Sequence, residues 1–243
     1  MARFLRETKT LFQHVPRTGG TWIENAIAAM GLNHDRCLDW GPLRLPRKHL
    51  FKSHYVYLPD EVLNVVAFVR HPLAYYESVW KYLKNVERRP ELIRRFYTRW
   101  DWHPKRTAAL HYQPHFDDWV FLMLKKDPLW YTRIVEGYVG PAGAEYCNYV
   151  GRTENLIVDF RTIMSHLGHA DRLDRIRDLC KKKVNGVDLP TKWNNDLREE
   201  VLKTESQVIE RFYANDTYDV RVPAWVDTSM ARTRRRPRKS QAG

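Results

Sequence analysis

The chain has 243 residues, of which 43% are hydrophobic and 29% are charged, and its formal net charge is +12 at pH 7. This length and apolar content allow one domain with a full core of its own. The sequence contains no run of about 18 apolar residues and no apolar N-terminal segment behind a charged start. A membrane span and a secretory signal are therefore not expected, and we expect a cytoplasmic protein.

The positive charge is unevenly distributed. Half of the excess lies in residues 231–243, where six Arg or Lys residues occur without an acidic one. Such composition predicts a single domain over residues 1–230 and a disordered basic tail over residues 231–243, through which contact with nucleic acid or an acidic polymer is possible. The three cysteines, Cys37, Cys147 and Cys180, are odd in number and widely spaced, which favours reduced thiols over a disulfide framework.

The first informative segment is a strand, loop and helix pattern near the N-terminus. Residues 11–15 are predicted to form a strand that ends at Pro16, because proline restricts the residue before it to extended geometry. A Gly19-Gly20 turn follows, and we expect Thr21 to cap a helix that ends before Gly31.

This pattern predicts an anion-binding loop. Unpaired N–H groups and the helix dipole face whatever lies over the loop, and Arg17 adds a full positive charge, so phosphate or sulfate is the favoured ligand. The loop lacks the Gly-x-x-x-x-Gly-Lys-Ser/Thr spacing that binds Mg-ATP, which disfavours an ATP kinase. A strand-to-helix turn with no ligand is the alternative from this segment alone.

A second segment points to the same ligand. The apolar run over residues 65–69 is typical of a strand buried on both faces, Arg70 follows at its carboxyl end, and a helix begins at Pro72. Ser78 lies two turns into that helix. Since ligands of open α/β sheets bind at the carboxyl ends of the strands, Arg17 and Arg70 should face one crevice.

Together these segments resemble the sulfotransferases that use 3′-phosphoadenosine 5′-phosphosulfate (PAPS). Residues 16–22, Pro-Arg-Thr-Gly-Gly-Thr-Trp, are similar to the family's 5′-phosphosulfate loop, and Arg70 with Ser78 is similar to its 3′-phosphate motif. A strand and helix over residues 149–168, with an Arg-x-Glu-Asn-Leu sequence, extend the resemblance to about residues 10–170. The donor ligands implied by it are Arg17, Thr18, Gly19, Gly20, Thr21, Trp22, Arg70 and Ser78, with Arg152 near the adenine or the 3′-phosphate.

The resemblance also implies the chemistry. Lys52-Ser53-His54 is similar to the family's Lys-Thr-His, so His54 is the expected catalytic base, with His49 and His71 as weaker candidates. Arg17 stands where the family has a lysine, and arginine is not equivalent to that compact charge, so Lys52 is the other candidate to stabilise the leaving phosphate. The expected product is 3′-phosphoadenosine 5′-phosphate (PAP), and no metal is expected.

The alternation of strands and helices predicts an α/β fold with a parallel central sheet flanked by helices. The resemblance implies that this fold is of the P-loop nucleotide-kinase-like sulfotransferase type. His14 is expected to be packed or at the surface, and Lys192 to close over the donor. An aromatic stretch that includes Trp102, Tyr112 and His115 is a candidate binding site for a small-molecule or saccharide acceptor, with a satellite core as the alternative. Further helices are predicted over residues 72–86, 91–100, 116–125, 171–183 and 195–213.

Two other functions remain possible at this point. A Mg-ATP-dependent kinase of small molecules or nucleotides would share the strand, loop and helix, and a basic nucleic-acid-binding protein would account for the tail and the aromatics. The nearest approach to a set of metal ligands is His111, His115, Asp117 and Asp118, which fits a polar loop before a helix better than a metal site.

Overall fold

The computed structural model describes residues 2–36, 62–87, 105–179 and 191–214. Their strands form one five-stranded sheet in the order β3-β1-β2-β4-β5. Strands β2, β4 and β5 are parallel, and β1 is antiparallel to both of its neighbours. The predicted α/β class is confirmed, with a sheet that is mostly parallel rather than wholly so. The strands are β1 (Arg3–Leu5), β2 (Thr10–Phe12), β3 (His34–Arg36), β4 (Asn64–Val69) and β5 (Tyr149–Arg152).

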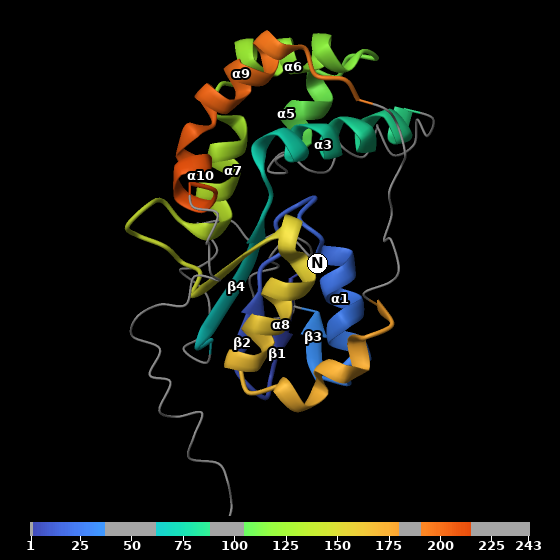
Figure 1. Cartoon of the computed structure of the whole chain (residues 1–243), viewed down its shortest axis with the longest axis vertical. Coiled ribbons are helices and arrows are strands. Elements are labelled where there is room, and N and C mark those ends of the chain that lie inside the picture. Colours follow the sequence, from blue (N-terminus) through green and yellow to red (C-terminus); the bar gives the residue numbers. More distant parts are fainter. Residues whose placement is uncertain (1, 37–61, 88–104, 180–190, 215–243) are drawn as a thin grey trace, which may run out of the picture.

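The helices cover both faces of the sheet, and Figure 1 shows α1 and α8 against it and most other helices gathered above it in that view. The α-helices are α1 (Gly20–Ala29), α3 (Pro72–Glu87), α5 (Lys105–Leu110), α6 (Phe116–Lys126), α7 (Trp130–Val139), α8 (Leu156–His166), α9 (Asn195–Thr204) and α10 (Ser206–Phe212). Two 3₁₀ helices, η1 (Thr153–Asn155) and η2 (Ala170–Ile176), flank α8.

Strand β4 divides the core into two parts. Val65, Ala67 and Val69 belong to a large cluster that includes residues of α3, α5, α6, α7, α9 and α10. Val66 and Phe68 belong to a second cluster with α1, α8 and η2. Because successive side chains of a strand point to opposite faces, an uninterrupted apolar run is what a strand covered on both faces requires.

Several predicted elements are confirmed within a residue or two. They are the strand over residues 65–69, the helices over residues 72–86 and 116–125, and the strand and helix over residues 149–168. The strand predicted over residues 11–15 is shorter, and α1 begins at Gly20, with Gly19 rather than Thr21 in the capping position. Gly19 has a left-handed φ of 85°, so helical geometry starts directly after it and leaves Thr21 in the first turn.

Two predicted helices differ from the structure. The segment expected to be helical over residues 171–183 contains the 3₁₀ helix η2, and the single helix expected over residues 195–213 is broken at Glu205 into α9 and α10. Strands β1 and β3 and helices α5 and α7 had not been anticipated. The helix predicted over residues 91–100 lies outside the described residues.

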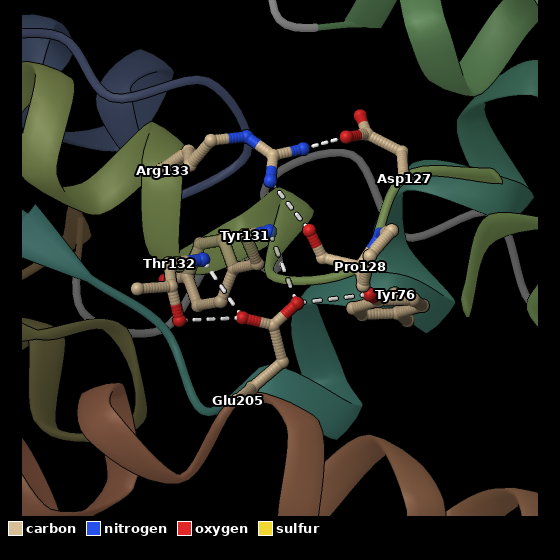
Figure 2. A network of polar contacts seen from close by, with 7 residues as sticks. All are labelled: Tyr76, Asp127, Pro128, Tyr131, Thr132, Arg133 and Glu205. Carbon is tan, nitrogen blue, oxygen red and sulfur yellow. Dashed lines mark hydrogen bonds and ion pairs between the residues drawn. The ribbon is translucent and has the colours of Figure 1, made fainter. Parts of the chain in front are cut away.

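Glu205 breaks the predicted helix because its side chain turns into the core, where it is completely buried. Helix α7 begins after Leu129, which has a left-handed φ of 60° and no side chain that could cap the helix. The Glu205 carboxylate instead accepts hydrogen bonds from the backbone N–H groups of Tyr131 (3.1 Å) and Thr132 (2.8 Å). It also accepts from the hydroxyls of Thr132 (2.6 Å) and Tyr76 (3.0 Å) (Figure 2). A distant acid thus caps α7 and ties it to α3.

The turn before α7 is held by a second set of contacts. Arg133, one turn into the helix, forms an ion pair with Asp127 and donates a hydrogen bond to the Pro128 carbonyl oxygen (Figure 2).

Among the described segments, no helix has the length and apolar composition needed to cross a membrane.

The Glu205 network gives a stability prediction. Glu205→Gln keeps the shape of the side chain but leaves one oxygen to accept the four hydrogen bonds, so buried donors lose their acceptor. We expect the free energy of unfolding to fall by about 2–4 kcal/mol, measured by urea denaturation. Glu200→Gln, an exposed change on α9, is the control and should leave it within about 0.5 kcal/mol. Equal stability of the two variants would contradict a capping role for Glu205.

Candidate anion-binding site

The loop between β2 and α1 has the geometry of an anion-binding loop. The Thr18 hydroxyl is buried and donates a hydrogen bond to the Val15 carbonyl oxygen (2.9 Å), which closes the turn from within. Within the described segments, no acceptor pairs with the backbone N–H groups of Thr18, Gly19 and Gly20. These donors lie at the start of α1, where the helix dipole favours a negative charge.

Both glycines of the loop lie where an added side chain would meet a neighbouring one. Gly19 combines its left-handed φ with a position against Leu156 of α8, whose Cδ2 would lie 2.7 Å from an added Cβ. At Gly20 an added Cβ would overlap the imidazole of His14. His14 therefore packs against the loop at the N-terminus of α1, which agrees with the expectation of a packed histidine.

Arg17 and Arg70 meet beside Ser78. The Arg17 Nε–H donates to the Ser78 hydroxyl oxygen (3.0 Å), and an Arg70 terminal N–H donates to the Arg17 carbonyl oxygen (3.0 Å). Arg17 has a left-handed φ of 69°, which is uncommon for a residue with a side chain and marks a constrained loop. The structure thus brings Arg17 together with Arg70 and Ser78, which follow it by 53 and 61 residues in the sequence.

The Arg17 guanidinium lies in an environment that opposes its charge. Burial lowers its pKa, the nearby charge of Arg70 lowers it further, and Tyr82 and Tyr75 act in the opposite direction. The guanidinium carbon lies 5.1 Å from the centre of the Tyr82 ring, a cation–π distance. Among the described residues, no carboxylate forms an ion pair with Arg17 or Arg70. Two like charges without a counter-charge form a site that favours an anion.

Arg70 is fixed by α7. The Arg70 backbone N–H donates to the Tyr131 hydroxyl oxygen (2.8 Å), and the same hydroxyl donates to the Arg70 carbonyl oxygen (2.7 Å). Tyr131 therefore links Glu205 to Arg70, because its backbone N–H donates to the Glu205 carboxylate and its hydroxyl pairs with the Arg70 backbone.

The end of β5 is joined to the end of β4 at the same edge of the sheet. The Thr153 hydroxyl donates to the Val69 carbonyl oxygen (2.9 Å), and the Glu154 carboxylate accepts from the His71 backbone N–H (2.9 Å) and the Tyr213 hydroxyl (3.0 Å). The Arg152 guanidinium lies over the Tyr213 ring at 5.6 Å. Burial lowers the pKa of His71 against the opposing effect of Glu154, which favours a neutral imidazole at pH 7.

The other predicted site residues are placed differently. Trp22 is buried and packs edge-on against Phe160 in the core, and Thr21 is exposed in the first turn of α1. The Tyr112 hydroxyl donates to Glu87 (3.0 Å) at the end of α3, about 14 Å along that helix from Ser78. His115 is exposed before α6, as is Lys192 before α9. Lys52, His54, His49 and Trp102 lie outside the described residues.

Sequence reasoning missed three tyrosines. Tyr75 and Tyr82 lie on the same face of α3 as Ser78, three residues before it and four residues after it. This helical spacing around Ser78 was a signal that could have found them. Tyr131 lies 61 residues from Arg70 in the sequence, and no local sequence pattern predicts that contact.

Within the described segments, no group of three or more His, Cys, Asp or Glu residues is arranged to hold a metal ion. Comparisons with models of known protein families, with curated protein sequences and with solved structures find no match for this chain.

Proposed function

We propose that this protein is a sulfotransferase, which transfers a sulfuryl group from PAPS to a hydroxyl or amine of an acceptor and releases PAP. The observation that carries the proposal is the convergence of Arg17, Arg70 and Ser78 beside a loop with free amides. The two guanidinium groups and the serine hydroxyl have no acidic partner among the described residues, and together they suit one phosphate group. The free N–H groups of the loop suit a second anionic group.

Each anionic end of PAPS has a set of donors in this proposal. Arg70 and Ser78 bind the 3′-phosphate, and the N–H groups of Thr18, Gly19 and Gly20 bind the 5′-phosphosulfate. We assign Arg17 to the first set, and the contact of its Nε–H with Ser78 supports that assignment. Lys52 is then the residue that we expect to stabilise the leaving phosphate, in the role of the family's loop lysine.

The reaction needs positioning, charge stabilisation and one proton acceptor. The acceptor oxygen or nitrogen forms a bond to sulfur, the bond from sulfur to the phosphate oxygen breaks, and that oxygen keeps the electron pair. Donors aimed at the leaving phosphate stabilise the charge that grows on it. The proton of the acceptor passes to a base, for which His54 is our candidate because an imidazole titrates near neutral pH.

The donor site is tested by calorimetric titration with PAP and, in parallel, with ATP and Mg²⁺. We expect the wild-type protein to bind PAP without a metal ion, and Arg70→Ala to weaken that binding by about 100-fold, because a charge-assisted contact to phosphate is lost. Arg177→Ala removes an exposed arginine and is the matched control, with unchanged affinity. A preference for Mg-ATP would instead support a kinase.

The proposed base is tested by His54→Ala. Because a general base acts on the acceptor and not on the donor, we expect sulfuryl transfer to fall by about 100-fold or more while the affinity for PAP stays the same. Transfer can be followed with ³⁵S-labelled PAPS and a panel of phenols, sugars and amines. Full activity of His54→Ala would remove His54 from the mechanism and leave the donor site unaffected.

A further inference from the structure

Tyr75 has an unusual position beside the two arginines. Its side chain is completely buried on α3, and its ring stacks on that of Tyr131, with centroids 3.9 Å apart and an interplanar angle of 21°. Among the described residues, nothing forms a hydrogen bond with the Tyr75 hydroxyl. Buried polar groups are almost always paired, so an unpaired hydroxyl at this place calls for a functional explanation.

Tyr75 adjoins the cluster through Tyr131, because its ring stacks on the tyrosine whose hydroxyl pairs with the Arg70 backbone. Burial raises the pKa of Tyr75 well above its ordinary value, and the two guanidinium groups each oppose that rise. The phenol therefore stays protonated at neutral pH and remains a hydrogen-bond donor. Tyr75 precedes Ser78 by three residues on the helix, so their side chains share one face of α3.

The cluster holds more donors than acceptors. The Nε of Arg70 is also buried without a hydrogen-bond partner, and guanidinium groups can only donate. Ser78 accepts from Arg17, which leaves the serine's own proton free to donate. Arg70, Ser78 and Tyr75 thus each hold a proton for which the described part of the chain offers no acceptor.

We propose that the Tyr75 hydroxyl is a further ligand, beside Arg17, Arg70 and Ser78, of the phosphate group that binds there, which is the 3′-phosphate if the proposed function holds. A phosphate supplies the missing acceptor oxygens and the missing negative charge together. Tyr75 then helps to select nucleotides that carry a 3′-phosphate over those that do not.

Tyr75→Phe tests this inference because it removes one oxygen and keeps the stacked ring. We expect the affinity for PAP, measured by calorimetry, to fall by about tenfold or more, and the affinity for adenosine 5′-phosphosulfate, which has no 3′-phosphate, to stay unchanged. Removal of an unpaired buried hydroxyl should also raise the melting temperature of the protein by about 2–4 °C. The control, Tyr149→Phe, changes a buried tyrosine of the other core cluster and should leave both affinities unchanged.

The outcomes separate this inference from the proposed function. Tyr75→Phe that binds PAP as tightly as wild type would overturn the inference and leave the sulfotransferase proposal standing. If the wild-type protein fails to bind PAP, inorganic phosphate becomes the probe, followed by ³¹P NMR line broadening. Phosphate binding that Tyr75→Phe weakens would then support the Tyr75 site and contradict PAPS as its substrate. Binding of neither probe would overturn both.

Discussion

The carboxylate of Glu205 is the constraint on which the site depends. Helix α7 follows a left-handed leucine that cannot cap it, so its first N–H groups need an acceptor from elsewhere in the chain. Glu205 supplies that acceptor and binds Tyr76 of α3 as well. Tyr131, which this cap holds through its backbone N–H, pairs through its hydroxyl with the N–H and C=O groups of Arg70. The position of Arg70, a proposed ligand-binding residue, therefore depends on Glu205, which lies far from it in the sequence.

The second constraint is the repulsion between Arg17 and Arg70. Each guanidinium is partly satisfied by a neutral oxygen, the Ser78 hydroxyl for Arg17 and the Arg17 carbonyl for Arg70, and Tyr82 adds a ring face. These contacts hold the two charges together without neutralising them. Keeping like charges close at the end of a sheet costs folding free energy, as expected where such a cluster serves the proposed binding of an anion.

The sequence predicted those parts of the fold that depend on local patterns. The apolar run of β4, the proline that starts α3 and the loop glycines are each visible within a few residues, and so are Arg17, Arg70 and Ser78 as a group. The break at Glu205 and the clamp by Tyr131 depend on contacts 74 and 61 residues apart along the chain. Helical periodicity continues through Glu205, so local reasoning predicts one helix where a buried acid requires two.

The late position of Glu205 also affects how the protein folds as it is made. Glu205 follows Tyr131 by 74 residues, so at ordinary rates of synthesis it leaves the ribosome about 4–15 seconds after the helix that it caps. Until then, the N-terminus of α7 has to be solvated, and the contact of the Tyr131 hydroxyl with Arg70 lacks the support of the Glu205 cap. The central strands and their arginines are therefore translated first, and the cluster of Arg17, Arg70 and Ser78 gains the support of Glu205 only when the last described helices pack.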